Sequence, residues 1–226
     1  MDLVVQKYGG TSVGSIKKIN FIAHNISKLR KQKKSVVVVV SAMAGETDRL
    51  DKITRRIAKI PDEKEYDQVI SSGEKISAGL LSIALIEINV KAVSLDPSKF
   101  NLLTDDLHSK AHILSVGTKK IKSFLKKGFV VVVPGFQGVN SKGDVTTLGR
   151  GGSDLTAVAL ASALRASHCE LLKDDVDGIY TADPRLYKRA KKINYISYPE
   201  MFEMSSLGAK VLQAKAVEYA NNLQVK

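Results

Sequence analysis

The sequence predicts an α/β protein: a three-layer α/β/α sandwich in which helices cover both faces of a mostly parallel, open sheet. The first observation is the run Val36 to Val40, five consecutive valines. A β-branched run without polar alternation is typical of a strand buried on both faces, as in a parallel sheet. The second observation is that strand-like and helix-like segments alternate along the chain, which implies β-α-β crossovers.

The first half of the chain shows this alternation. Residues 3–6 are an apolar strand candidate, and residues 15–31 carry isoleucine and leucine at helical spacing. The valine strand 36–40 is followed by helical patterns at 47–59 and 75–88. The stretch “VKAVSL” is then predicted to form another short strand.

The second half continues the same pattern. Residues 117–127 are predicted to be helical, and “FVVVVPGFQG” is a second all-apolar strand that ends in Pro-Gly. An alanine-rich helix is expected at 154–166, and “CELLKDDVDG” begins as a strand and ends in a turn. Closing helices are expected at 198–204 and 207–222. The 226 residues suit one large domain or two small ones, and no internal repeat or low-complexity linker divides them.

Composition and charge exclude several classes of protein. The formal net charge is +12, but the lysines are scattered beside helical patterns and the few aromatic residues do not alternate with them, so we expect no nucleic-acid partner. No apolar run approaches the roughly 20 residues of a membrane helix, and the start lacks the features of a signal peptide, so we expect no membrane partner. The single cysteine, Cys169, suits the reducing cytoplasm. The histidines show no metal-ligand spacing, so no metal site is expected.

The loops that would carry chemistry follow the predicted strands. In open α/β sheets, ligands bind beyond the carboxyl ends of the strands. The loops “KYGGTS”, “SAMAGETD” and “PGFQG” fall there, and “LGRGGSD” leads into a helix. Glycine-rich loops that open helices present backbone N–H groups and the positive end of the helix dipole to anions. Two such loops facing one site would hold a polyphosphate, although neither matches a Walker or dinucleotide-binding pattern and each is equally compatible with a bare turn.

Charged residues in these loops strengthen the interpretation as a site. Lys7 ends a buried strand, so it must reach the surface or meet an anion. Asp154 would orient that lysine or compensate its charge. Ser153 or Asp154 could instead be a simple helix N-cap.

Two further residues suit an amino-acid substrate. Arg150 could pair with a small carboxylate through two parallel hydrogen bonds, or be a solvated loop arginine. Glu74 could accept a hydrogen bond from an ammonium group, or only favour a helix start. An arginine and a glutamate together would fit a zwitterion.

The last informative loop is “KDDVDGIYTADPR”. Its acidic residues, Asp174, Asp175 and Asp177, lack the spacing and the distal glutamate of a calcium-binding EF-hand. The functional alternative is the edge of a nucleotide site, with Tyr180 beside a base and Arg185 near phosphate.

Taken in order, these segments carry a family resemblance. “KYGGTSVGS”, “SAMAGETD”, “SSGEKISAGLL”, “PGFQGV”, “TTLGRGGSDLTAVALA” and “DDVDGIYTADPR” resemble bacterial aspartokinases, which belong to the amino acid kinase family. The likeness runs from about residue 3 to residue 222, and it implies one amino acid kinase catalytic domain over residues 1–226. The “KYGGTS” start favours aspartokinases over acetylglutamate, glutamate and uridylate kinases.

The resemblance implies phosphorylation of the side-chain carboxylate of L-aspartate by ATP with Mg²⁺. The product would be 4-phospho-L-aspartate, at the first step toward lysine, threonine, methionine and diaminopimelate. Lys7 is implied to bridge the transferring phosphoryl group, and Asp154 to order the catalytic lysines. The implied aspartate-binding residues are Thr47, Glu74, Arg150 and Ser153. The implied ATP-binding residues are Lys7, Gly9, Gly10, Ser41, Asp174, Asp175, Tyr180, Arg185 and Lys210.

The implied chemistry agrees with the residue inventory. Phosphoryl transfer spreads negative charge over the transferred oxygens, so lysines, N–H groups and Mg²⁺ provide most of the catalysis. The nucleophile is a carboxylate with an ordinary pKa of about 3.9, which is already ionised at neutral pH. No general base is required.

The sequence also departs from the aspartokinase pattern. Lys173 and Asp174 stand where an aromatic residue followed by Ser or Thr is usual, and Pro134 replaces a small residue. The sequence ends at “ANNLQVK”, where aspartokinases continue into two regulatory ACT-type domains, so we expect those domains to be absent. A homodimer is expected, and a separate regulatory chain is one of the open alternatives for a further partner. The departures also motivate an alternative function, a catalytically impaired kinase fold that binds ligand or regulates a partner.

Overall fold

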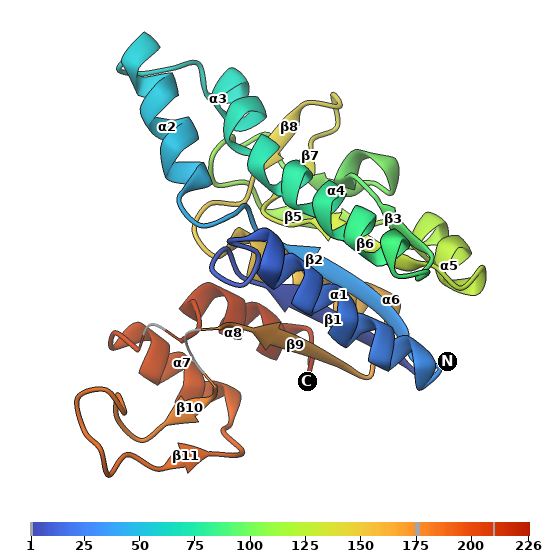
Figure 1. Ribbon diagram of the computed structural model, residues 1–226. Helices are drawn as coiled ribbons and strands as arrows, with labels where there is room; N and C mark the ends of the chain where they lie inside the picture. The colour runs from blue at the N-terminus through green and yellow to red at the C-terminus, as the bar shows by residue number, and fades with distance from the viewer. Residues whose placement is uncertain (1, 175–176, 210) are drawn as a thin grey trace.

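The computed structural model describes residues 2–174, 177–209 and 211–226 (Figure 1). Its centre is a five-stranded sheet with the strand order β3-β6-β2-β1-β9, and all neighbouring strands run parallel. The strands are β1 (Leu3–Tyr8), β2 (Ser35–Val40), β3 (Ala92–Ser94), β6 (Val130–Pro134) and β9 (His168–Leu172). The mostly parallel sheet predicted from the sequence is confirmed.

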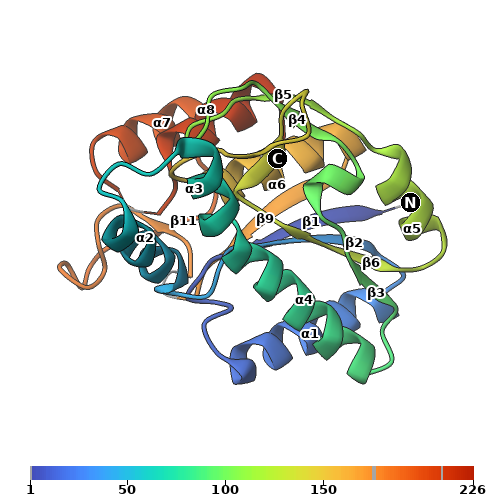
Figure 2. The same ribbon diagram turned by 90° about the horizontal axis from the view of Figure 1, so that it is seen from above.

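Helices cover both faces of this sheet, as the sequence predicts (Figure 2). One face carries α1 (Ile16–Lys31) and α4 (Ser72–Glu87). The other carries α5 (Lys119–Lys126), α6 (Gly152–Leu164) and α8 (Ala214–Asn222). The α/β/α sandwich is therefore confirmed.

The valine run forms the middle of both apolar layers. Val36, Val38 and Val40 pack with residues of α1 and α4, whereas Val37 and Val39 pack with residues of α5 and α6. All five side chains are buried. The alternation follows from the geometry of a strand, because successive side chains point to opposite faces. A run without polar residues is stable only where both faces are covered.

A second sheet was not expected from the sequence. Its strands are β4 (Leu102–Thr104), β5 (Ile113–Val116), β7 (Gln137–Val139) and β8 (Val145–Thr147), in the order β5-β4-β7-β8. In the stretch “FVVVVPGFQG”, the predicted strand is β6, which ends at Pro134 as expected, but a second strand, β7, begins at Gln137 in the other sheet. Strands of three or four residues are too short to show a clear periodicity. A small hairpin joins β10 (Ile179–Tyr180) to β11 (Lys192–Ile193).

The remaining helices differ from expectation mainly at their ends. The structure adds α3 (Glu63–Ile70) between α2 (Glu46–Ile57) and α4, and a short 3-10 helix, η1 (Pro97–Lys99). The expected helix at 207–222 begins only at Ala214, because α7 (Tyr198–Ser206) is followed by Gly208 with a φ of +110°. The segment Glu63–Glu87, which comprises α3 and α4, is long and apolar enough to cross a membrane by length and composition alone, and half of its most apolar window is buried within the fold.

The topology places a ligand crevice at the end of β1. β1 is an inner strand, with β2 on one side and β9 on the other. α1 leads from β1 to β2 on one face, whereas α6 leads to β9 on the opposite face. A crevice forms at the carboxyl ends of the strands where the connections diverge in this way. In Figures 1 and 2 the N-terminus lies at one end of the sheet, and α2 and β11 lie at the other.

Leu85→Ala should lower the free energy of unfolding by about 2–5 kcal/mol, because it opens a cavity in the layer between α4 and the sheet. Leu85 is fully buried there. The matched control is Ile86→Ala on the same helix, where the side chain is 56% exposed and the change should stay within about 0.5 kcal/mol. Urea denaturation measures both values, and equal losses would contradict this packing of α4.

Candidate functional site

A pocket of about 960 Å³ opens at the carboxyl end of the central sheet. Its walls come from the ends of β1 and β2, from α2, α3 and α4, and from the segment that joins β8 to α6. The sequence-predicted residues that line it are Lys7, Ser41, Thr47, Glu74, Arg150, Ser153 and Asp154. The structure therefore brings together both predicted catalytic residues, all the predicted substrate-binding residues and one further nucleotide-binding residue.

A buried ion pair lies in the wall of this pocket. Lys7 Nζ lies 2.7 Å from Asp154 Oδ1, and the two side chains are only 8% and 5% exposed. The contact is an ion pair rather than a regular hydrogen bond, since Asp154 Oδ1 has no hydrogen-bond partner among the described residues. Lys7 belongs to β1, opposite Val39 and Leu171 of the adjacent strands. The lysine of a buried strand thus meets an anion inside the protein, and its ammonium group borders the pocket.

The N-terminus of α6 points its first turn at the same pocket. Gly151 is the N-cap, with a φ of +75°, and a Cβ there would lie 2.8 Å from Gln213 Cγ. Ser153 and Asp154 lie inside the first turn, both buried, and no side chain caps the helix. The interpretation of either residue as a simple N-cap is therefore wrong. Because a helix N-terminus carries a partial positive charge, this turn favours an anion beside Lys7.

Glu74 is a buried carboxylate with unused hydrogen-bonding capacity. It lies in the first turn of α4 but is only 3% exposed, so it is not an acid on a solvated helix start. Oε1 accepts a hydrogen bond from the Ala42 N–H at 3.0 Å. Oε2 is buried and has no partner within the described part of the chain. Burial raises the pKa of Glu74 to about 7. A ligand ammonium group would satisfy the open oxygen and favour the ionised form.

The other predicted substrate residues occupy the rim. Arg150 is exposed in the loop between β8 and α6, whereas Thr47 is half-buried in the first turn of α2. Ser41 directly follows β2. The pocket therefore combines an exposed arginine, Arg150, with a buried carboxylate, Glu74, which suits the two charges of an amino acid.

The predicted nucleotide residues are divided between two places. Tyr180 and Arg185 line a separate pocket of about 560 Å³ beside β10. Tyr180 donates a hydrogen bond to Asp177, and Arg185 pairs with Asp183 at 2.9 Å. The remaining predicted positions are Gly9 and Gly10, which follow β1, Asp174, which follows β9, and Asp175 and Lys210, which lie outside the described residues.

Gly10 has a packing reason that does not depend on a ligand. A Cβ at this position would lie 2.8 Å from the Ala42 carbonyl oxygen. Ala44 N donates a hydrogen bond to Gly10 O at 3.1 Å. The loops after β1 and β2 thus lie in direct contact, and a side chain at Gly10 would force them apart.

The unusual pair Lys173 and Asp174 is engaged by neighbouring elements. Lys173 Nζ donates a hydrogen bond to the Val211 carbonyl oxygen. Asp174 forms an ion pair with Lys18 of α1 at 2.9 Å. The hydrogen bond from Lys18 holds the pKa of Asp174 below its ordinary value. The negative charge expected near the phosphates is therefore balanced by a lysine that the sequence analysis did not single out.

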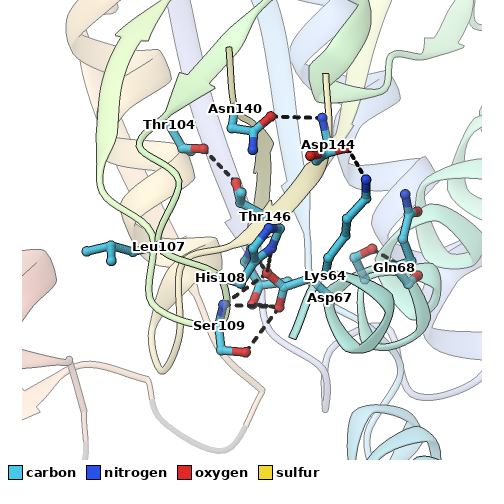
Figure 3. Close-up of polar contacts among 12 residues, drawn as sticks. Lys64, Asp67, Gln68, Thr104, Leu107, His108, Ser109, Asn140, Asp144 and Thr146 are labelled. Carbon is cyan, nitrogen blue, oxygen red and sulfur yellow. Dashed lines mark hydrogen bonds and ion pairs between the residues drawn. The ribbon is translucent and has the colours of Figure 1, made fainter. Parts of the chain in front are cut away.

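The sequence analysis also missed a buried polar cluster beside the pocket. Asp67, fully buried on α3, accepts hydrogen bonds from His108 and Ser109 (Figure 3). A second histidine, His112, pairs with Asp105 on the surface. Among the described residues, no group of three or more His, Cys, Asp or Glu side chains could hold a metal ion.

Known proteins with a similar sequence or structure include amino acid kinases. A sequence model described as “Amino acid kinase family” matches residues 2–226. An aspartokinase of Pseudomonas aeruginosa is 50% identical over 225 residues, covering all of this chain and 54% of that protein. The crystal structure of an aspartate kinase from Synechocystis aligns with a TM-score of 0.87 and 43% identity, over 99% of this chain and 36% of that one.

A second solved structure is informative about ligands. Aspartokinase III of E. coli, in complex with aspartate and ADP, aligns with a TM-score of 0.84 and 31% identity, over 99% of this chain and 60% of that one. The chain spans about half the length of the curated relatives that it matches.

Glu74→Gln should stabilise the protein at pH 8 and leave its stability unchanged near pH 4.5. The folded-state pKa of Glu74, about 7, lies above the ordinary value of 4.5, so the folded state holds the proton more tightly and loses stability as the pH rises between these values. Glutamine removes that loss, which is on the order of 1–3 kcal/mol. Thermal unfolding across this pH range measures the difference. A variant that is no more stable than the wild type at pH 8 would contradict the burial of an open carboxylate.

Proposed function

Because the chain belongs to the amino acid kinase family, we propose that it transfers the γ-phosphoryl group of ATP to the side-chain carboxylate of L-aspartate. One observation carries the proposal: the Lys7–Asp154 pair shares a single pocket with Glu74 and Arg150. Lys7, held by Asp154, is suited to a phosphoryl group. Glu74 and Arg150 are suited to an amino acid. The names of the relatives, and the aspartate and ADP bound to one of them, support this choice of substrates.

Each pocket residue has a distinct task in this mechanism. Arg150 binds the α-carboxylate of aspartate and Glu74 accepts a hydrogen bond from its ammonium group, with Thr47 and Ser153 completing the substrate contacts. The substrate side chain is then directed toward Lys7. A substrate held at two points in this way reacts as if at high local concentration.

The transfer itself moves no proton to the protein. A carboxylate oxygen of aspartate forms a bond to the γ-phosphorus as the bond to the bridging oxygen of ADP breaks, and ADP leaves with that electron pair. Lys7 and the N-terminus of α6 stabilise the charge on the transferred oxygens. Asp154 holds the Lys7 ammonium group in position, since Lys7 Nζ and Asp154 Oδ1 lie 2.7 Å apart.

A Mg²⁺ ion would be held mainly by the phosphates of ATP, since no group of three or more His, Cys, Asp or Glu side chains in the described part of the chain could hold it alone. Mg²⁺ in phosphotransferases needs only one or two carboxylates beside substrate phosphates and waters. Asp154 and Asp174 are the carboxylates near the phosphate end, and each is already paired with a lysine. When bound, Mg²⁺ would neutralise part of the phosphate charge.

The proposal extends to the domain, the cell compartment, the oligomeric state and the pathways that the product serves. Residues 1–226 form the catalytic domain of a cytoplasmic homodimer, and the acyl phosphate product serves lysine, threonine, methionine and diaminopimelate synthesis. One motive for the alternative, a catalytically impaired kinase fold, is the departure at Lys173 and Asp174. That motive is weaker now, because Lys18 balances the Asp174 charge.

A coupled assay of ADP release tests the proposed function directly. The chain is supplied with Mg·ATP and, in separate reactions, L-aspartate, L-glutamate, N-acetyl-L-glutamate or UMP. Turnover with aspartate alone supports the assignment. Turnover with another acceptor but not with aspartate would overturn the substrate, and tight binding of both ligands without turnover would favour the impaired kinase.

Lys7→Ala should lower kcat by about 10²–10³-fold, because it removes the cation that stabilises the transferred oxygens. It should also lower the melting temperature, since the buried Asp154 loses its partner. Lys34→Ala is the control: Lys34 is paired only loosely with Asp2, at 3.9 Å, on the surface, and kcat should not change. A near-normal kcat for Lys7→Ala in folded protein would remove Lys7 from the mechanism.

Arg150→Ala should raise the KM for aspartate about tenfold or more and leave the KM for ATP unchanged. The lost contact is to a part of the substrate that does not react, so it contributes to binding in the ground state and the transition state alike. Arg165→Ala, at the opposite end of α6, is the matched control. Steady-state kinetics with each substrate varied in turn measures both constants; an unchanged aspartate KM would reject this role.

A further inference from the structure

A buried carboxylate joins three segments around the substrate pocket. Asp67 of α3 has no exposed surface, and its oxygens accept hydrogen bonds from His108 and Ser109 (Figure 3). Thr147 also donates to them. The N–H groups of Ser109 and Thr147 donate at 2.9 Å and 3.0 Å, the Thr147 hydroxyl donates at 2.7 Å, and His108 Nδ1 lies 3.0 Å away. We refer to these residues, Asp67, His108, Ser109 and Thr147, as the Asp67 cluster.

Two of these segments lead directly to the residues assigned to substrate binding. α3 is followed by α4, whose first turn carries Glu74. Thr147 ends β8, and Arg150 follows three residues later. Ser109 and Thr147 themselves line the pocket. The Asp67 cluster therefore connects the segment that carries Glu74 to the segment that carries Arg150.

The cluster also holds the loop that contains His108 and Ser109 in an unfavourable backbone conformation. The φ of Ser109 is +64°, in the left-handed region that serine seldom adopts. Such conformations persist only where surrounding contacts impose them, and here Ser109 makes three hydrogen-bond contacts with Asp67. A Cβ added to Gly149 would lie 3.2 Å from Ser109 O, so this strained loop lies directly against the loop between β8 and α6.

We infer that Asp67 is a positioning residue for the amino-acid substrate, an inference that rests on the proposed function. The Asp67 cluster fixes Glu74 and Arg150 relative to each other, so that the ammonium and carboxylate groups of one substrate reach both. Asp67 acts through these residues and does not touch the substrate itself.

The choice of an aspartate at this position agrees with that role. A buried carboxylate is stable only when its acceptor sites are filled, and charge-assisted hydrogen bonds are about twice as strong as neutral ones. One side chain can therefore draw donors from two other segments to a single point. The oxygens are fixed by several donors at once, so the segments cannot shift independently.

Asp67→Asn tests the inference, because the asparagine side chain has the size of aspartate but its NH₂ group cannot accept the hydrogen bonds that the cluster donates. The KM for aspartate should rise about tenfold or more, with the KM for ATP within about twofold, as expected when one substrate is misplaced. Hydrogen exchange measured by mass spectrometry should become faster at residues 107–111 and 147–151. If Asp67 only stabilised the fold, Asp67→Asn would lower the melting temperature and leave the aspartate KM of the folded fraction unchanged.

A second pair of variants decides the matter where Asp67→Asn does not fold. His108→Ala removes one donor at the edge of the cluster, and His108→Asn replaces it with an amide N–H. The aspartate KM should rise in the alanine variant and return most of the way in the asparagine variant. Lys64→Ala is the matched control, since Lys64 lies on the same helix and its ion pair with Asp144 is outside the cluster (Figure 3); both KM values should stay unchanged.

The outcomes separate this inference from the proposed function. An unchanged aspartate KM in Asp67→Asn, an equal rise in both KM values, or an aspartate KM that is the same in His108→Ala as in the wild type would overturn the inference alone. A wild-type chain that neither binds nor phosphorylates aspartate would overturn the proposed function, and this inference with it.

Discussion

The ion pair between Lys7 and Asp154 is the interaction on which the rest of the site depends. It joins β1, an inner strand of the central sheet, to the first turn of α6, which covers one face of that sheet. Each ion loses several kcal/mol of solvation when it is buried, and only close pairing offsets this loss. A hydrophobic pair would join strand and helix at lower cost. The charges are therefore better explained by what the ammonium group does in the pocket than by the stability of the fold.

The position of that pair follows from the topology of the sheet. α1 follows β1 on one face and α6 leads into β9 on the other, so the carboxyl end of β1 is left uncovered by either layer. The loops that follow β1 and β2 then come into contact at Gly10 and Ala42. Ala42 in turn donates to Glu74 at 3.0 Å, so the loop that closes on β1 also orients the carboxylate on α4. The contact between the loops after β1 and β2 therefore also sets the orientation of the Glu74 carboxylate.

The sequence could predict the parts of this structure that have a strong local signal. The run Val36 to Val40 required a strand covered on both faces, and that requirement led to the correct layers. The four-stranded second sheet had no such signal, because its strands are short and depend on pairing between distant segments. Asp67 was missed for a related reason. It shares a helical face of α3 with Ile70, three residues away, and both side chains are buried, so a charge on an apolar face was visible. Its donors, however, lie 41 and 80 residues further along the chain.

The buried carboxylates around the pocket differ in how far their acceptor capacity is used. Asp67 receives donors at both oxygens from three residues, which leaves a ligand little to add. Glu74 uses one oxygen, and the other has no partner among the described residues. A saturated carboxylate fixes the protein, whereas an unsaturated one keeps an energetic penalty that a ligand can remove. An ammonium group bound at Glu74 would remove that penalty and lower the pKa that burial has raised to about 7. The fold thus places a rigid carboxylate behind the pocket and an incomplete one within it, and the incomplete one is where an amino acid gains most by binding.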